Sequence, residues 1–522
     1  MIRKIRHIAL LSVATSAALS LSSCGGNKFG GHSGEQSSVT GWNYNDPEQG
    51  GFEYISGFEQ ETGPGLVFIE GGTFVMGRVE QDVMLNNNST PRRATVTSFY
   101  MDECEVSNAN YREWLHWINL VFETNKAVYL SALPDTLVWR RPLAYNEPYV
   151  QNYLRHPAYA DYPVVGVSWR QANDFCAWRT DRVNEYRLFE RGIIQMNVRE
   201  QKEENNFNTG AYLYGQQEVV DGENPIEDLA NEGQTRRARM DDGILLPDYR
   251  LPSEAEWEFA ALGLIGNTVD ERMSDRKIFP WNSHVVRNAD DSERGRMMAN
   301  FVRGNGDYMG TAGYLNDKGD ITVDVHSYWP NDYGLYCMAG NVNEWVRDVY
   351  RALTFDDADE LNPFRGNVFK QLITDESGAP VEKDSVGRLR YKVQEQSEIG
   401  DRKNYRNAYQ INYLDGDNSS NLNIGMDWGG SNYNTNSMYG GMATAVDESG
   451  EEIPNTIGKQ LGSEVSDRAR VYKGGGWRDR AYWLSPGARR FLDENECRDD
   501  LGFRCAMTRV GAPEQNGKSQ YK

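Results

Sequence analysis

Cysteine and histidine are both scarce in this chain of 522 residues, which contains six of each. No two cysteines have the Cys-x-x-Cys spacing that is typical of redox and zinc sites, and no His-x-His or His-Glu-x-x-His pattern occurs. A metal site built on thiolate or imidazole ligands would therefore have to be assembled from distant loops. The sequence does not favour that chemistry.

Positive charge and long hydrophobic runs are also in short supply. Lys and Arg together number 55 against 76 Asp and Glu, so the net charge is −21. A chain of this charge is not expected to bind nucleic acid or anionic membrane surfaces, because phosphate groups repel it. Only residues 8–21 approach the roughly 20 apolar residues of a spanning helix. The 39% apolar content is still sufficient for a large core.

The N-terminus has the layout of a secretory signal, with basic residues in the first six positions followed by the apolar run 8–21. The next residues, Leu-Ser-Ser-Cys, end at Cys24 and resemble the bacterial lipobox, whose cysteine is lipidated after cleavage. We therefore expect a lipoprotein signal peptide over residues 1–23 and a lipid anchor on Cys24. The alternative is an ordinary signal peptide with a chance cysteine.

Small and polar residues follow the predicted anchor, and residues 24–64 are expected to contain a flexible tether. No acidic cluster follows Cys24, and such a cluster would resemble a surface-export signal. The expected location is therefore the outer membrane, lipid-anchored, at its periplasmic face. Residues 511–522 are expected to form a disordered tail.

Three helix starts can be recognised from capping residues. Ser107 precedes an apolar stripe with helical spacing, so it is a candidate N-cap. Ser168 with Gln171, and Ser253 with Glu256, have the Ser-x-x-Gln/Glu spacing of a capping box. The sequence therefore predicts three capped helices.

The remaining pattern is one of short strands and long loops. Residues 66–77 contain β-branched and aromatic residues on both sides of a Gly-Gly pair, which predicts a β-hairpin. Glycine is abundant, and residues 401–441 are rich in Asn, Tyr and Gly. We therefore predict a loop-rich α+β fold.

Seven motifs, in order, resemble the formylglycine-generating enzyme (sulfatase-modifying factor) family. The resemblance covers residues 65–510 and implies a loop-rich fold related to C-type lectins. Long insertions at about 181–249 and 351–468 depart from the family pattern and suggest additional interaction surface. The motifs are Gly71–Gly77, Glu105–Tyr111, Pro163–Trp169, Arg250–Glu258, Tyr333–Trp345, Gly474–Arg478 and Leu501–Cys505.

The resemblance also implies where catalysis would occur. The family's enzymes hold Cu(I) between two cysteines spaced Cys-x4-Cys, since soft Cu(I) prefers sulfur. The matching positions here are Ala481 and Pro486, and residues 480–487 contain neither Cys nor His. We therefore expect no enzymatic activity and no catalytic cofactor. Glu254 and Glu256 are interpreted as a solvated residue and a capping residue.

A structural calcium ion is also implied by the resemblance. Asp320 is an alternative to Asp317 as its ligand, and an Asx turn with a solvated carboxylate is the alternative to any ion. At a second family site Cys337 replaces an oxygen donor beside Glu344, so we do not expect calcium there. The implied ligands of the first site are Asn300, Phe301, Asp317 and Gly319.

The family pairing of cysteines implies a disulfide between Cys176 and Cys505. Among Cys104, Cys337 and Cys497, two are available to pair while the third stays free or bonds a partner. The alternative is that all three are buried thiols.

Tryptophans recur in the motifs, and their helical or strand spacing favours core positions over sugar-stacking surfaces. The 401–441 loop is the better candidate for a contact surface. The motif tryptophans are Trp114, Trp169, Trp257, Trp345 and Trp477.

The lipobox, the domain and the insertions together resemble the gliding-motility lipoproteins of the GldJ/GldK/PorK group. This resemblance implies a structural or assembly component of the gliding motility and type IX secretion machinery. Its expected partners are protein components of that apparatus, outer-membrane lipid through Cys24, and, in a GldK/PorK role, a GldN/PorN-like subunit. The alternatives are a retained oxidase and a module that contacts glycan or peptidoglycan.

Overall fold

The computed structural model describes residues 36–55, 58–78, 80, 82, 88–196, 198–203, 205–231, 233–266, 277–302, 319, 321–350, 363–384, 386–394, 445–446, 452–453 and 468–511. The chain divides into two compact units. One contains Met1–Phe58 with Ile226–Arg236, and the other contains Glu59–Pro225 with Arg237–Lys522. The predicted signal peptide and Cys24, and the 401–441 loop, lie outside the described residues.

A four-stranded antiparallel sheet organises the larger unit, with strand order β1-β4-β16-β7. The C-terminal strand β16 lies between β4 and β7, so the two ends of the domain meet in this sheet. The strands are β1 (Leu66–Ile69), β4 (Phe99–Asp102), β7 (Tyr249–Arg250) and β16 (Ala506–Thr508).

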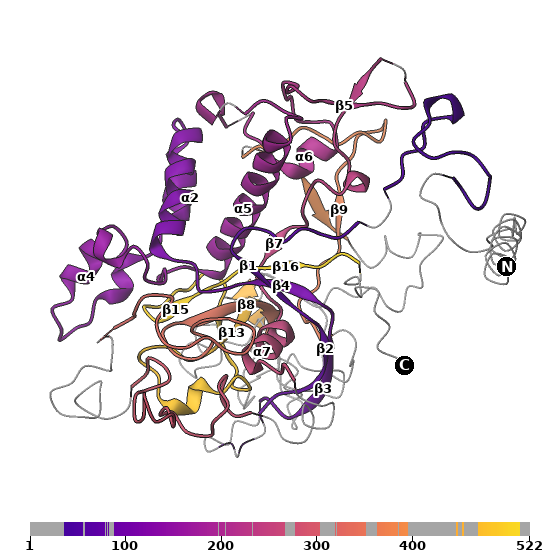
Figure 1. The fold of residues 1–522 in the computed structure, drawn as a ribbon. Helices are drawn as coiled ribbons and strands as arrows, with labels where there is room; N and C mark the ends of the chain where they lie inside the picture. Colours follow the sequence, from indigo (N-terminus) through magenta and orange to yellow (C-terminus); the bar gives the residue numbers. More distant parts are fainter. Residues whose placement is uncertain are drawn as a thin grey trace, which may run out of the picture. The chain divides into compact units, whose positions relative to one another are not determined.

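Apolar side chains cover both faces of this sheet. Tyr100 and Met507 pack into one core cluster with helices α2 and α5, whereas Phe99, Met101 and Ala506 pack into another with helix α7 and strands β2 and β3. Figure 1 shows these helices on the two sides of the sheet. The alternation follows from the period of two along a strand. The elements named here are α2 (Asn108–Val121), α5 (Trp169–Glu190), α7 (Glu254–Leu262), β2 (Gly72–Met76) and β3 (Arg92–Val96).

The three predicted capped helices are confirmed as α2, α5 and α7. Ser107 Oγ accepts the amide three residues later at 3.3 Å. Both capping boxes are complete, because Gln171 Oε1 accepts the Ser168 amide at 2.9 Å and Glu256 Oε2 accepts the Ser253 amide at 2.8 Å. Helix α5 runs to Glu190, which lies within the predicted insertion at 181–249.

The hairpin predicted over residues 66–77 is wrong in its pairing. Both strands form, but β1 pairs with β4 and β2 pairs with β3. A side chain on Gly71 would collide with the backbone, since its Cβ would lie 2.3 Å from the Val96 carbonyl. The chain therefore passes at Gly71 from the sheet that contains β1 into the pair formed by β2 and β3. The segment 92–102 passes between the same two sheets, because β3 pairs with β2 and β4 pairs with β1.

A second four-stranded sheet has the order β14-β13-β8-β15. Strand β13 pairs antiparallel with β14 and β8, and the short β15 runs parallel to β8. This sheet positions the motifs around the Gly-Gly-Gly-Trp loop. The strands are β8 (Asn343–Val349), β13 (Ala469–Lys473), β14 (Arg490–Asp493) and β15 (Leu501–Gly502).

Shorter elements connect these layers and occupy the insertions. The hairpin β9–β10 lies in the predicted insertion at 351–468, and β11 pairs with β12 in the same insertion. The further elements of the larger unit are α3 (Lys126–Ala132), η2 (Thr136–Trp139), α4 (Glu147–Asn152), η3 (Pro157–Tyr159), η4 (Val198–Glu200), α6 (Thr209–Leu213), η5 (Met240–Asp242), β9 (Lys370–Leu372), β10 (Tyr391–Val393), β11 (Ala445–Val446), β12 (Glu452–Ile453) and η8 (Ala481–Leu484).

The smaller unit joins residues 36–58 to part of the first insertion. It contains the 3-10 helix η1 (Pro47–Gln49) and the strand pair β5 (Ile226–Glu227) and β6 (Thr235–Arg236). Arg236 Nε donates to a Glu53 carboxylate oxygen at 2.9 Å. The predicted tether over 24–64 thus includes a stretch with hydrogen-bonded turns.

The described residues form a mixed α/β structure, as the α+β prediction requires at this level. No helix in the described part of the chain is both long and apolar enough to span a bilayer.

Candidate functional site

The Gly-Gly-Gly-Trp loop after β13 has a backbone that only glycine fits. Gly475 has a φ of +71°, and a Cβ there would lie 2.9 Å from the Trp483 carbonyl oxygen. A Cβ on Gly476 would lie 2.9 Å from Nδ2 of Asn343. The loop therefore packs directly against Asn343 at the start of β8 and against Trp483, which follows the loop in sequence.

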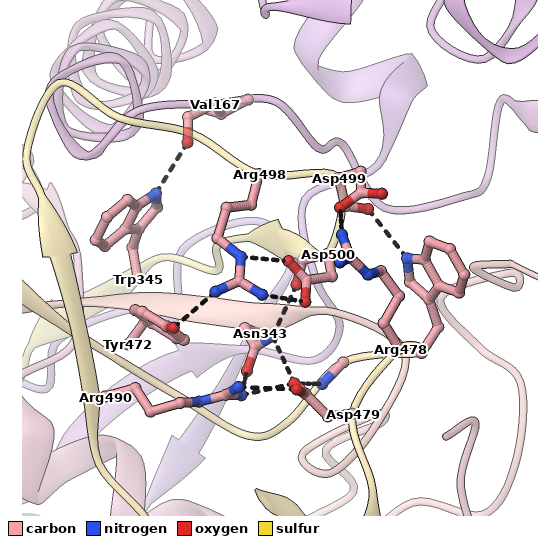
Figure 2. A network of polar contacts seen from close by, with 12 residues as sticks. Val167, Asn343, Trp345, Tyr472, Arg478, Asp479, Arg490, Arg498, Asp499 and Asp500 are labelled. Atoms are coloured by element: carbon pink, nitrogen blue, oxygen red, sulfur yellow. Dashed lines mark hydrogen bonds and ion pairs between the residues drawn. The ribbon is translucent and has the colours of Figure 1, made fainter. Parts of the chain in front are cut away.

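Asp479, three residues after this packed glycine, binds Arg490 of β14 through two hydrogen bonds. Arg490 Nη1 and Nη2 donate to its two oxygens at 2.8 and 2.6 Å. Asn343 Nδ2 and the Gly476 amide also donate to Asp479, at 3.0 and 2.8 Å. Figure 2 shows these groups converging from the loop, β14 and β8. Both oxygens of this carboxylate thus accept hydrogen bonds from donors held in place by the surrounding fold.

A second carboxylate of the same network, Asp500, pairs with Arg498. The guanidinium Nε and Nη2 donate to the two Asp500 oxygens at 2.8 and 2.9 Å, and Nη1 donates to the Tyr472 hydroxyl at 3.0 Å. The Asp500 carbonyl accepts the Asn343 amide at 2.7 Å. The pair is therefore joined to β8 and β13 (Figure 2).

The third carboxylate, Asp499, bridges two guanidinium groups. Arg141 Nη2 donates to it at 2.5 Å, and Arg478 Nη1 binds its other oxygen. The Asp499 carbonyl accepts the Trp477 indole N–H at 3.0 Å (Figure 2). The loop tryptophan is therefore held by the backbone of the segment before β15.

The titration of this network reflects its ion pairs. Burial would raise the pKa of Asp479, but the hydrogen bonds and charge of Arg490 hold it below its usual value. Burial raises the pKa of Asp500 against the opposing charge of Arg498. Each carboxylate has a guanidinium partner with good geometry, so the network is suited to fixing the loop rather than to transferring protons.

The positions that the family resemblance assigns to the cysteine pair follow Asp479 closely in sequence. Ala481 begins the 3-10 helix η8, and Pro486 is buried shortly after it. Neither side chain offers a metal ligand. Within the described residues no group of three or more His, Cys, Asp or Glu is placed to hold a metal ion.

A small cavity of about 110 Å³ adjoins the same segment. The Arg78 guanidinium lies over the Tyr482 ring at 3.7 Å and donates to the Tyr482 carbonyl at 2.9 Å. The Tyr482 hydroxyl bonds Asp82, and Arg78 pairs with Glu80 at 2.6 Å. Polar side chains from two segments thus line this cavity and contact each other.

Glu344, considered at sequence level beside a second calcium site, instead binds Arg504. Two Arg504 nitrogens donate to its two oxygens at 2.6 Å each, and the Trp257 indole donates at 2.8 Å. Cys337 is buried, with its thiol 3.6 Å from the Val325 carbonyl. These contacts are typical of a buried core, and the absence of calcium at this second site stays a prediction.

The interpretation of Glu254 as a solvated residue is wrong. Its side chain is 2% exposed and pairs with Lys473 at 3.2 Å and with Arg489 at 2.9 Å. Lys473 is itself fully buried and also pairs with Glu258 at 2.9 Å. Lys473, on β13, and Arg489, just before β14, are both more than two hundred residues away in sequence, so no local pattern predicts these partners. Glu256 does serve the capping box, as predicted.

The predicted calcium ligands are only partly within the described residues. Asn300 is buried and its Nδ2 donates to the Ile321 carbonyl at 2.7 Å. Phe301 is buried beside it, and Gly319 is described. Asp317 lies outside the described residues, so the carboxylate on which the site depends is not placed. Calcium remains a prediction.

The two cysteines predicted to form a disulfide lie together. The Sγ atoms of Cys176 on α5 and Cys505 before β16 are 3.5 Å apart, and both residues are buried as thiols. Cys497 Sγ lies 3.9 Å from an Asp135 carboxylate oxygen, and Cys104 is also a free thiol. The crosslink itself remains a prediction.

The core interpretation of the motif tryptophans fits their positions. Trp169 is partly buried, with Arg470 stacked on its ring at 3.8 Å, and its indole donates to Val346 at 2.9 Å. The fully or nearly fully buried members are Trp114, Trp257, Trp345 and Trp477. The sequence did not single out Trp117 and Trp178, which lie on helices α2 and α5.

Fold and motifs together define a sulfatase-modifying factor class of protein. The sulfatase-modifying factor enzyme 1-like domain matches residues 51–389, and the chain belongs to this family. Among its relatives, it is 24% identical over 300 residues to the formylglycine-generating enzyme of Mus musculus, covering 54% of this chain and 58% of that protein. It is 24% identical over 334 residues to the inactive C-alpha-formylglycine-generating enzyme 2 of Bos taurus, covering 58% and 78%.

The family therefore includes proteins described as active and as inactive. The chain spans somewhat less than two thirds of the length of the mouse enzyme. Among solved structures, PvdO from Pseudomonas aeruginosa is similar with a TM-score of 0.38 and 13% identity, covering 85% of this chain and 93% of that one. Treponema denticola variable protein 1 has a TM-score of 0.35 and 14% identity, covering 85% and 94%.

Proposed function

We propose that this protein is a non-catalytic, lipid-anchored component of the gliding motility and type IX secretion machinery, with a structural or assembly role. The non-catalytic part of the proposal rests on the identity of two residues, one at the start of η8 and one just after it. Ala481 and Pro486 stand where the family's enzymes hold copper between two cysteines. The neighbouring carboxylates of Asp479 and Asp500 are engaged by Arg490 and Arg498. We therefore infer that these residues form a structural framework and have no catalytic role.

The membrane location rests on Cys24 and the lipobox. An acidic chain of net charge −21 gains nothing from anionic headgroups, so acyl chains on Cys24 would hold it at the outer membrane. The protein surface is then available for protein partners at the periplasmic face.

The second insertion supplies a candidate partner surface. Strands β9 and β10 pair with no further strand within the described residues, and Tyr391 and Val393 are each about half exposed. Exposed strand edges and aromatic side chains favour protein contacts. The proposal is a GldJ-like role, and a GldK/PorK-type ring subunit that binds a GldN/PorN-like partner is the alternative within the same machinery.

The partner proposal is tested by crosslinking and affinity isolation of the full chain from native membranes. We expect secretion or motility components to be recovered with the wild-type protein and to be reduced when Tyr391 and Val393 are both replaced by Ser. A Cys24→Ala variant is expected to leave the membrane fraction. Recovery of the protein without any component of this machinery would refute the assignment.

A retained oxidase is the competing function from another class, and several relatives of this chain are named formylglycine-generating enzymes. We expect no oxidation of a sulfatase-derived cysteine peptide by the protein reconstituted with Cu(I), because the thiolate pair is missing. A competent family enzyme assayed in parallel provides the control. Peptide oxidation above the copper-only background would contradict the non-catalytic proposal.

A further inference from the structure

The smaller unit exposes several large apolar side chains on one short segment. Val39 is 91% exposed, Trp42 is 61% exposed and Phe52 is 64% exposed. Apolar groups exposed together in this way indicate a contact with a protein or with a membrane. The matched family domain begins at residue 51, so it does not account for Val39 or Trp42.

Hydrogen bonds hold the backbone that carries these side chains. The Ser37 amide donates to the Trp42 carbonyl at 2.8 Å and closes the turn that contains Val39. A Cβ on Gly50 would lie 3.8 Å from the Trp42 ring, so this ring lies beside the turn that precedes Phe52. The exposure of Val39 and Trp42 therefore does not come from an unstructured loop.

Other residues supply the internal packing of this unit. The Tyr44 ring centroid lies 5.5 Å from that of Phe52 and 4.8 Å from that of Tyr54. A Cβ on Gly51 would lie 2.3 Å from the Leu229 carbonyl oxygen, so the backbone packs closely there. Val39 and Trp42 can therefore be replaced without removing these contacts.

The charge of the unit selects against an anionic surface. Segments 36–58 and 226–236 together contain six acidic residues and a single basic residue, Arg236. Arg236 already donates to a Glu53 carboxylate oxygen at 2.9 Å. An anionic surface would repel this unit, so a contact through Val39 and Trp42 has to be apolar and has to involve a surface without net charge.

The position of the predicted lipid anchor indicates which surface lies within reach. Gln36, where the described chain begins, follows Cys24 by twelve residues. A chain of that length spans roughly 43 Å at most when fully extended. A bilayer that holds acyl chains on Cys24 therefore stays close to the 37–42 turn, and this confinement gives the bilayer a high effective concentration there. A protein partner has no such advantage.

We propose that Val39 and Trp42 insert into the zwitterionic lipid surface that holds Cys24, so that the smaller unit lies at the bilayer interface. This inference rests on the lipid anchor of the proposed function. Tryptophan is enriched at membrane–water interfaces, because its ring is apolar while its N–H group stays hydrated. Acyl chains hold the protein, and the two side chains set the orientation of the unit at the surface.

The test is photolabelling of the acylated full-length chain in phosphatidylcholine vesicles whose acyl chains carry a diazirine. Mass spectrometry locates the labelled residues. We expect labelling at residues 39–42. It should fall about tenfold in a Val39→Ser/Trp42→Ser variant, because two apolar side chains then no longer enter the lipid.

Leu143→Ser/Tyr145→Ser is the matched control, because these two apolar side chains are also highly exposed but belong to the larger unit. It should leave the labelling at residues 39–42 unchanged, and equal losses in the two variants would overturn the proposal. Acylated Cys24 without labelling at residues 39–42 would overturn this inference alone. A chain isolated from native membranes without acyl chains on Cys24 would overturn both this inference and the proposed anchor.

Vesicle composition separates apolar contact from electrostatic attraction. We expect labelling on phosphatidylcholine to persist at high salt and to be no stronger when phosphatidylglycerol is added. Stronger labelling on the anionic vesicles that high salt abolishes would overturn the proposal. A photoreactive residue at position 42 in native membranes should give lipid adducts. A protein adduct in their place would also overturn it, since the turn would then be a protein-docking surface.

Discussion

Arg504, in the motif that ends in Cys505, forms a deeply buried ion pair with Glu344 of β8. Their side chains are 0% and 1% exposed, and the guanidinium binds both carboxylate oxygens. Removing one partner of such a pair is strongly destabilising, because the other charge then stays buried without compensation. The pair thus fixes the end of the chain to β8.

Replacing Arg504 with Lys should lower the free energy of unfolding by roughly 3 kcal/mol, since a lysine cannot reproduce the two parallel hydrogen bonds. Chemical denaturation of the full chain measures this change. Arg388→Lys is the matched control, because Arg388 and Asp174 are partly exposed and should lose about 0.5 kcal/mol or less. Equal losses in the two variants would show that the buried geometry is unimportant.

Asp348 is expected to make stability depend on pH. Burial and the negative charge of Glu254 raise its pKa to about 7, whereas an unfolded Asp titrates near pH 4. The folded state therefore holds a proton that the unfolded state releases, and stability is lost as the pH rises from about 4 to about 7.

An Asp348→Asn variant lacks this titration. The difference in unfolding free energy between variant and wild type should therefore move in favour of the variant by up to ~4 kcal/mol between about pH 4 and pH 7. Denaturant melts across that range measure it, and any constant effect of the substitution cancels. A difference that does not change with pH would contradict the raised pKa.

Helix starts are decided by local capping, which acts at the scale of single elements. Helix α5 carries much of the larger core and begins with the Ser168–Gln171 capping box. A serine cap satisfies an amide that would otherwise have no partner within the helix.

Ser168→Ala should therefore cost about 1 kcal/mol, and the thermal midpoint should fall accordingly. Ser131→Ala is the control, because that hydroxyl donates only to the Val128 carbonyl on α3 and caps nothing. Its effect should be within about 0.5 kcal/mol. If both variants melt alike, the capping box does not stabilise α5.

Pairing between strands is decided above the level of the element. The sequence around Gly71 favours a hairpin between β1 and β2. In the structure β1 pairs with β4, and β2 pairs with β3. A glycine pair permits a tight turn but does not specify one. Here the missing side chain of Gly71 instead allows the Val96 carbonyl to approach the backbone closely.

At the scale of the whole molecule, Cys176 and Cys505 connect α5 to the last strand. They are 329 residues apart in sequence, and their sulfur atoms are 3.5 Å apart. Oxidation would close a very long loop, which stabilises by about 6 kcal/mol in the chain-entropy model.

We expect non-reducing peptide mapping of protein from an oxidising compartment to recover a peptide joining these two cysteines. Reduction should lower the melting temperature of the wild type but not that of a Cys176→Ala/Cys505→Ala double variant. Cys497→Ala is the control and should keep the sensitivity to reductant. A wild type that melts identically with and without reductant would exclude the crosslink.

The sequence by itself determined the local features and the family. Serine caps at 107, 168 and 253 act over three residues, and the lack of Cys and His in residues 480–487 is a matter of residue identity. The burial of the motif tryptophans followed from their spacing and size. Such features depend on neighbours within a turn or a strand, so a linear pattern contains them.

Only the tertiary structure decided which distant groups meet. It placed Lys473 between Glu254 and Glu258, and it assembled a cavity of about 420 Å³ from helices α2, α3 and α5 and part of an insertion. The sequence does not distinguish a buried acidic residue from a solvated one, because the burial depends on a strand some two hundred residues away. Packing over that separation is what makes an acidic residue a core ion pair here.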